Sequence, residues 1–197
     1  MPKPRVDPAD VIAFSNAAEF ETWLADHVDE RHGVWLKIAK KGSGVASLTG
    51  DEAVDVGLCY GWISGQRKAH DEVYYLQEYV PRRPGSRWSR VNVRKVEALV
   101  EAGRMRPAGL AEVDAARADG RWDAAYGSQR DASVPPDLAA TLTGRPRAAQ
   151  AFDSLSKSGQ YAVILEVVTA RTTRTRAAHL GKAITALEPR DADSPAD

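Results

Sequence analysis

The sequence predicts an α+β protein, with a small antiparallel sheet of about three strands packed by helices and a helical C-terminal module after it. Residues 34–39 have the period-two pattern of a half-buried strand, in which Val34, Leu36 and Ile38 share one face. Residues 62–70 and 73–80 are two runs rich in β-prone residues. After residue 136 the apolar residues follow a helical period. We therefore expect three parts. They are an α+β domain with a basic and aromatic cleft at residues 1–127, a helical C-terminal module at residues 128–190, and an acidic disordered tail at residues 191–197.

Local capping signals place the first two helices. Asn16 followed by Glu19 predicts one helix start, and Thr49 with Glu52 forms the capping-box pattern of a second. The strand expected at residues 34–39 lies between these helices. An α-β-α order therefore opens the chain.

The two β-prone runs predict a hairpin. Asp-Glu is not a favoured two-residue turn, so the connection between residues 62–70 and 73–80 can be longer than two residues. Ser89 is a suitable cap for a helix that ends near Gly103. The buried side of this helix is expected to carry Val93, Val96 and Val100.

Beyond Met105 the sequence is helical, with a polar, proline-bearing link at residues 128–136. Helices are expected at residues 107–119, 136–141, 147–156 and 161–170, and from Thr172 onward. No run of about eighteen apolar residues suggests a membrane span, and the N-terminus lacks the apolar core of a secretory signal. We expect a cytoplasmic protein with no membrane span.

Charge is sorted along a chain that is neutral overall. Residues 62–106 carry ten basic and five acidic side chains, and residues 144–190 carry eight and three. The stretch from Arg82 to Lys95 holds six basic side chains and no acidic one. A localised positive field attracts anionic ligands, whereas the neutral total argues against bulk coating of a polyanion.

These residues predict a ligand-binding cleft for a small anionic or aromatic molecule. Arginine forks bind phosphate or carboxylate oxygens, indole faces accept flat rings, and the start of the helix at Ser89 offers backbone N–H groups. The candidate ligand-binding residues are Trp62, Arg67, Lys68, Arg82, Arg83, Trp88 and Asn92. The competing interpretation is that the two tryptophans belong to the core and the arginines are solvated or paired with acidic segments.

Two other function classes stay open. A nucleic-acid-binding regulatory protein would use the basic and aromatic side chains with Arg171, Arg174 and Lys182 of the last helix. An enzyme with a Cys59 nucleophile would need a nearby base, and no histidine lies in a motif that supplies one. Cys59 is also the only cysteine, which excludes an intramolecular disulfide. We expect no catalytic residues, no metal and no cofactor, and the sequence leaves the oligomeric state open.

The order of several segments resembles the YdeI/OmpD-associated family, also called bacteriocin-protection proteins. The resemblance rests on Lys40-Lys41-Gly42-Ser43-Gly44, on Leu58 to Gly65, on Pro81-Arg82-Arg83 with Ser86 to Ser89, on Gly103 to Gly109, and on C-terminal positions from Phe152 to Leu180. It covers nearly the whole chain. It implies a role in stress or antimicrobial-peptide resistance and brings no catalytic residues. Ser64 stands where the family pattern leads us to expect Asp, so a function of that carboxylate would be lost in this chain.

Overall fold

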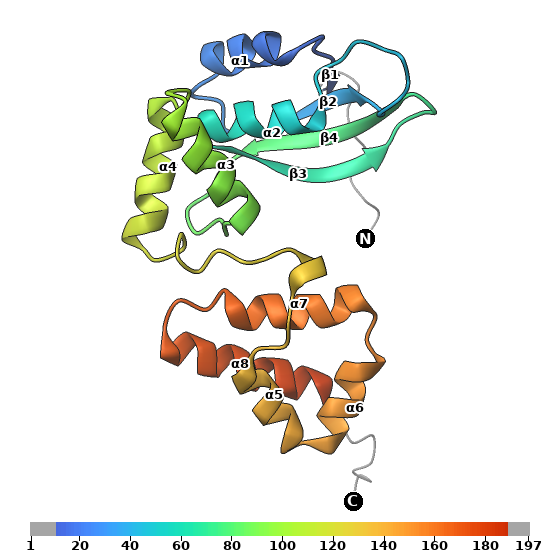
Figure 1. Ribbon diagram of the computed structural model, residues 1–197, viewed down its shortest axis with the longest axis vertical. Coiled ribbons are helices and arrows are strands. Elements are labelled where there is room, and N and C mark those ends of the chain that lie inside the picture. The colour runs from blue at the N-terminus through green and yellow to red at the C-terminus, as the bar shows by residue number, and fades with distance from the viewer. Residues whose placement is uncertain (1–10, 189–197) are drawn as a thin grey trace, which may run out of the picture. The chain divides into compact units, whose positions relative to one another are not determined.

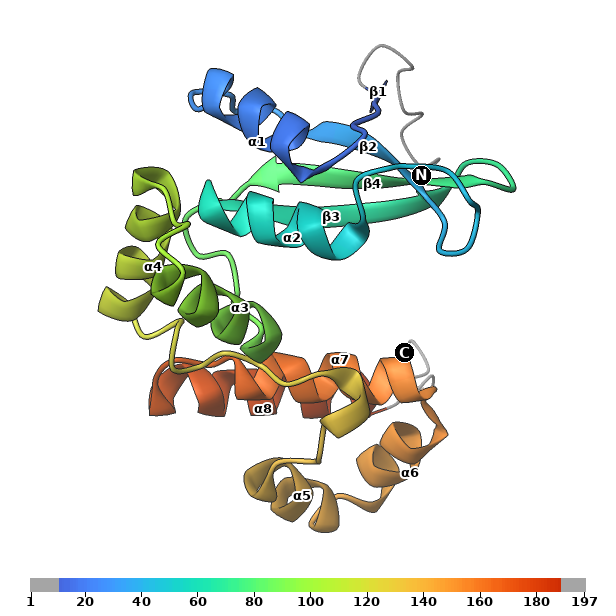
Figure 2. The same cartoon turned by 45° about the horizontal axis from the view of Figure 1, so that its top comes forward.

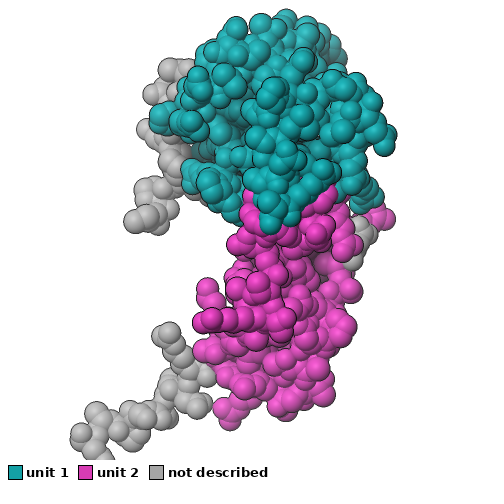
Figure 3. All heavy atoms as spheres, turned by 90° about the vertical axis from the view of Figure 1, so that its left-hand side faces the viewer, with its two compact units in different colours: residues 1–86, 92–118 teal, residues 87–91, 119–197 magenta. Residues whose placement is uncertain are grey.

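The computed structural model describes residues 11–188, which form two compact units. Of the described residues, unit 1 contains 11–86 and 92–118, and unit 2 contains 87–91 and 119–188 (Figure 3). The described residues contain eight α-helices and one four-stranded sheet. The predicted α+β class with a C-terminal helical region is confirmed. The predicted boundary between residues 127 and 128 stays a prediction, and the predicted tail at 191–197 lies outside the described residues.

The sheet of unit 1 has the strand order β1-β2-β4-β3. Its strands are β1 Val11–Ile12, β2 Val34–Ala39, β3 Trp62–Ala69 and β4 Tyr74–Pro81. β2 and β3 both pair antiparallel with β4, whereas the short β1 pairs parallel with β2. The three predicted strands are present, and β1 is an additional edge strand that the sequence analysis did not predict.

The hairpin between β3 and β4 closes through a longer turn than two residues. The Asp71 carboxylate accepts hydrogen bonds from the backbone N–H groups of Val73 and Tyr74, at 2.8 and 2.7 Å. An aspartate that satisfies the backbone in this way makes the turn without a glycine. These bonds also hold the pKa of the Asp71 carboxyl below its usual value.

Four helices belong wholly or mainly to unit 1. They are α1 Ala17–Asp26, α2 Gly50–Cys59, α3 Arg90–Glu101 and α4 Pro107–Ala118. The side chain of Asn16 accepts the N–H of Glu19, and that of Thr49 accepts the N–H of Glu52, so both predicted caps are confirmed. In α3 the buried residues are Val96 and Leu99, while Val100 is 48% exposed. The prediction that Val100 is buried is therefore wrong.

α1 and α2 cover one face of the sheet (Figures 1 and 2). Alternate side chains of β2 point to that face because successive residues of a strand face opposite sides. The buried cluster there contains Phe20, Leu24, Val34, Leu36, Ile38, Leu48, Ala53, Val56, Trp62 and Tyr79. This core fixes the start of α2 above the ends of β3 and β4.

Unit 2 is built from helices. They are α5 Pro136–Thr143, α6 Pro146–Ser154, α7 Lys157–Val168 and α8 Thr173–Leu187, preceded by a 3-10 turn at Gln129–Asp131. Their shared core contains Leu138, Leu142, Ala148, Phe152, Ile164, Val167, Ile184 and Leu187. Across the described residues of both units, every helix is too short or too polar to cross a membrane.

Candidate functional site

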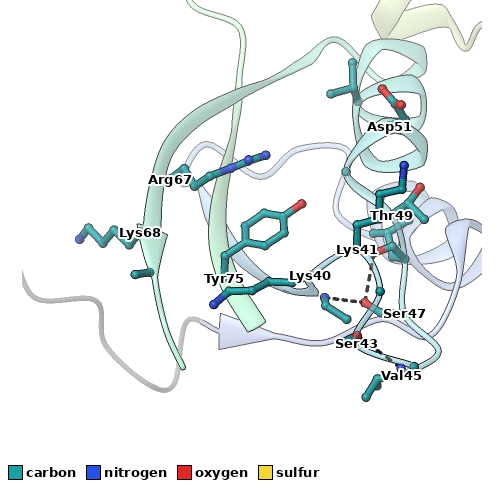
Figure 4. Close-up of a pocket in the computed structure, with 17 residues that line it drawn as sticks. Lys40, Lys41, Ser43, Val45, Ser47, Thr49, Asp51, Arg67, Lys68 and Tyr75 are labelled. Carbon is teal, nitrogen blue, oxygen red and sulfur yellow. Dashed lines mark hydrogen bonds between the residues drawn. The ribbon is translucent and has the colours of Figure 1, made fainter. Parts of the chain in front are cut away.

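A cleft of about 1130 Å³ opens in unit 1 beside the start of α2 (Figure 4). It is formed by the loop of residues 40–49, by the first residues of α2, and by side chains of β3 and β4. Its charged and aromatic lining residues are Lys40, Lys41, Asp51, Arg67, Lys68 and Tyr75. Four basic side chains and one acidic one give the cleft a positive balance.

The loop of the cleft is anchored at its far end. Leu48 is buried, and its N–H donates to the carbonyl of Phe14 at 3.0 Å. The Ser47 hydroxyl accepts the N–H of Ala39 at 3.2 Å and donates to the carbonyl of Leu48 at 3.1 Å. The tip turns at Gly42, whose φ of 84° lies in the left-handed region that glycine tolerates. The exposed tip of the loop is therefore attached to residues 47 and 48, which hydrogen bonds hold in place.

Side chains of the first turn of α2 form hydrogen bonds with backbone groups at the start of this helix. The Glu52 carboxylate accepts the backbone N–H of Thr49 at 2.9 Å and its hydroxyl at 2.7 Å. These bonds lower the pKa of Glu52, and the negative charge meets the positive end of the helix dipole. The basic side chains are therefore the main source of positive charge in this cleft.

Arg67 is held in place by neutral groups. Its Nε donates to Oε1 of Gln77 at 3.0 Å, and its guanidinium lies 4.3 Å from the centre of the Tyr75 ring. Gln77 is buried, and its amide nitrogen donates to the carbonyls of Gly65 and Gln66 at 3.1 and 3.0 Å. Because these contacts are uncharged, they position the guanidinium without neutralising it.

A β-bulge turns Arg67 toward α2. Ser64 pairs with Tyr79, but Arg67 pairs with Gln77, so the register shifts between Ser64 and Arg67. In a regular ladder Arg67 would lie opposite Leu76, on the sheet face away from α1 and α2, because a one-residue slip exchanges the two faces. The bulge thus places Arg67 in the cleft.

The bulge itself is held by Glu78 and a glycine. The Glu78 carboxylate accepts the N–H of Gln66 at 3.0 Å, and a Cβ at Gly65 would collide with that carboxylate. Ser64 is exposed at the start of this bulge.

Only some of the basic side chains in the lining face the cleft. The Lys40 ammonium donates to the carbonyl of Asp71 at 2.7 Å, and the Lys68 ammonium lies 4.6 Å from the centre of the Trp35 ring. Lys68 pairs with Leu76, on the opposite sheet face from Arg67. Figure 4 accordingly shows Lys68 pointing away from α2.

Arg67, Tyr75 and Lys41 remain as donors to a ligand. Figure 4 shows Arg67 and Tyr75 on the strand side of the cleft and Lys41 beside Thr49 on the helix side. Within residues 11–188, neither Arg67 nor Lys41 forms an ion pair, and the Tyr75 hydroxyl makes no hydrogen bond. The Tyr75 oxygen lies only 2.8 Å from the position of a Cβ at Gly50, so it reaches the start of α2.

Of the seven candidate residues from the sequence, Arg67 and Lys68 line the cleft. Trp62 is 3% exposed and belongs to the core of unit 1. Trp88 belongs to unit 2, where its ring lies 4.9 Å from that of Trp122. The structure thus places both tryptophans among buried aromatic side chains.

The three remaining candidates do not line the cleft either. Arg82 is buried, Arg83 is exposed in the segment after β4, and Asn92 is half-buried on α3. Their part in ligand binding stays a prediction. Lys41, Asp51 and Tyr75 were not among the predicted ligand-binding residues, although Lys41 lies in the Lys-Lys-Gly-Ser-Gly run that carries the family resemblance.

Residues of the other two function classes are also placed. Cys59 is buried near the end of α2, and burial raises the pKa of its thiol, which disfavours the nucleophilic thiolate. Arg171 lies 3.4 Å from the Asp119 carboxylate, while Arg174 and Lys182 are exposed on α8. Nucleic-acid binding by these residues stays a prediction.

Two known families match the chain, and their matches divide it near the boundary between the two compact units. Residues 12–112, which include the whole cleft, match a family described as Domain of unknown function (DUF8412). Residues 131–189, which include all four helices of the unit 2 core, match the family described as Bacteriocin-protection, YdeI or OmpD-Associated. No curated protein and no solved structure matches the chain. The resemblance noted in the sequence is confirmed over residues 131–189, which are similar to the YdeI/OmpD-associated family. Its extension to the segments before residue 131 stays a prediction. The match over residues 12–112 shows that the chain belongs to the DUF8412 family.

Proposed function

We propose that this protein is a non-catalytic binding protein for a small anion, and that the anion binds in the cleft of unit 1. The observation that carries the proposal is Arg67, an arginine in a concave site that two neutral groups hold in place. As a physiological role we propose stress or antimicrobial-peptide resistance. The support for that role is the description of the family that residues 131–189 match.

The arrangement around Arg67 favours binding for an entropic reason. An exposed arginine has many rotamers, and fixing them on binding costs roughly 0.5–1.5 kcal/mol. Gln77 and the Tyr75 ring restrict Arg67 before any ligand arrives. The terminal nitrogens of the guanidinium stay available for two parallel hydrogen bonds to an oxyanion.

Lys41 adds a second charge from the opposite side of the cleft. Its side chain is exposed, and the loop that carries it is anchored by Leu48. An anion between Arg67 and Lys41 would contact both elements that frame the site. No side chain in the lining offers an activated nucleophile, which favours binding over catalysis.

Titration of the full chain with inorganic pyrophosphate, followed by calorimetry, tests the proposal. We expect saturable binding that weakens as salt is added, and an Arg67→Gln variant whose affinity is about ten-fold lower, a loss of about 1.4 kcal/mol. Arg31→Gln is the matched control, because Arg31 is exposed in unit 1 outside the cleft. Circular dichroism checks that both variants are folded. Equal affinities of Arg67→Gln and the unaltered chain would refute the assignment of the site.

A further inference from the structure

The cleft is much larger than an isolated oxyanion. Its volume of about 1130 Å³ lies above the range for sites that enclose drug-sized ligands, which is roughly 300–1,000 Å³. Arg67, Lys41 and Tyr75 would engage only part of a molecule that fills such a space. Such a volume leaves room for a ligand that has an organic body attached to its anionic group.

The donors at the anionic end suit a phosphate monoester better than a carboxylate. A phosphate monoester carries a charge of about −1.5 to −2 at neutral pH and three acceptor oxygens. The cleft offers two cations, Arg67 and Lys41, and a phenolic donor, Tyr75. Both the charge and the number of donor groups match a phosphate.

The lining also argues against a nucleotide. Recognition of a base in a protein site commonly uses an aromatic face on which the base stacks. Tyr75 is the one aromatic side chain among the lining residues, and the Arg67 guanidinium already covers one face of its ring. Trp62 and Trp88, which the sequence suggested as stacking partners, are buried elsewhere.

Asp51 is the one acidic residue among the lining residues of the cleft. Its side chain is 92% exposed on the first turn of α2, across the cleft from Arg67, and its Oδ1 lies 3.6 Å from the Lys95 ammonium, so its other oxygen is the one left for a ligand. An ionised carboxylate only accepts hydrogen bonds, so it suits hydroxyl groups and repels a second phosphate. A ligand with one anionic group and a hydroxyl-bearing body suits both the basic side chains and Asp51.

We infer that the ligand of this cleft is a phosphorylated sugar or polyol with a single phosphate. Arg67, Lys41 and Tyr75 bind the phosphate, and Asp51 accepts hydrogen bonds from the hydroxyl groups. This inference rests on the proposed function, because it specifies the anion that the same site binds.

Calorimetry with five probes tests the inference. They are glucose 6-phosphate, ribose 5-phosphate, glycerol 3-phosphate, adenosine monophosphate and inorganic phosphate. We expect the best of the three phosphorylated polyols to bind about ten-fold more tightly than inorganic phosphate and than adenosine monophosphate. The additional affinity would report hydrogen bonds that inorganic phosphate cannot make.

An Asp51→Asn variant separates hydroxyl recognition from general electrostatics. We expect it to weaken binding of the phosphorylated polyol about five-fold and to strengthen binding of inorganic phosphate, because a nearby negative charge is removed. Asp29→Asn is the control, since Asp29 is exposed outside the cleft and carries the same charge. A purely electrostatic role of Asp51 would shift both affinities in the same direction and would overturn the inference.

The remaining outcomes separate the inference from the proposed function. If inorganic phosphate binds through Arg67 and no phosphorylated polyol binds better, the inference is wrong and the anion site stands. Tightest binding of adenosine monophosphate would also overturn the inference and would identify a nucleotide site. If none of the anions binds, the proposed function fails together with the inference.

Discussion

The arginines of unit 2 and the arginine of the cleft in unit 1 differ in what holds them. In unit 2, Arg176 forms two hydrogen bonds to the Asp137 carboxylate at 2.6 and 2.9 Å, and Arg121 and Arg145 lie 2.7 and 2.8 Å from carboxylates. Arg67 instead contacts an amide oxygen and a phenol ring. The ion pairs of Arg176 and Arg145 join segments of the fold, whereas an arginine held by neutral groups keeps its charge for a ligand.

This difference shows why segment charge is a poor guide to a site. Residues 62–106 and 144–190 both carry a net charge of +5. In the second segment, basic side chains form ion pairs, such as that of Arg145 with Glu188. Even in the first, Arg106 pairs with Glu21 at 2.7 Å. Only the contacts of each side chain distinguish a structural cation from a binding one.

The largest expected effect is a loss of stability from a substitution in the core of unit 2 that leaves the cleft unchanged. Leu138 is fully buried in the helical core, so Leu138→Ala should lower the free energy of unfolding by about 3 kcal/mol. Urea denaturation of the full chain measures this loss. Every residue that lines the cleft belongs to unit 1, so pyrophosphate affinity under native conditions should stay unchanged. A folded Leu138→Ala protein with reduced affinity would show that the cleft depends on the core of unit 2.

A pair of matched arginine substitutions sharpens the comparison. Arg176→Gln removes both bonds to Asp137 and a bond to the carbonyl of Val167, so we expect a loss of stability of about 2 kcal/mol. Arg67→Gln removes one bond to Gln77 and a ring contact, and we expect a loss of about 1 kcal/mol or less. For pyrophosphate affinity the order should reverse, so that Arg67→Gln loses more affinity than Arg176→Gln. Equal effects on stability and on binding would remove the distinction between the two arginines.

Structural features that depend only on residues close in the sequence could be predicted. The caps at Asn16 and Thr49 act over three residues, and both are present. The two-residue strand β1 was missed because two residues show no periodicity, and its pairing with β2 joins distant segments. The error at Val100 has a similar origin, since the direction of a helix face depends on what packs against it.

The cleft could be predicted only in part. Arg67 and Lys68 were chosen for their charge, but the sequence could not show that a bulge turns one toward α2 and leaves the other on the opposite face. The run from Arg82 to Lys95 was more conspicuous, although the cleft is built from the loop at residues 40–49 and from two strands. Bringing Lys41 near Arg67 requires the strand order β2-β4-β3, which is a long-range property.

The smallest expected effect concerns the pH dependence of unit 2. The bonds from Arg176 hold the pKa of the Asp137 carboxyl below its usual value. Asp137 therefore adds stability above the pKa of an unfolded aspartate, about 3.9, and this stability is lost as the pH falls through the lower pKa of the folded state. The Asp137 side chain is 36% exposed, so the contribution should be less than about 1 kcal/mol. Comparing urea denaturation of the unaltered chain and Arg176→Gln at pH 7 and pH 3 isolates it, because other carboxyls titrate in both proteins. The difference in stability between the two proteins should be smaller at pH 3, and a difference that is constant or larger in acid would show that Arg176 stabilises α8 without the charge of Asp137.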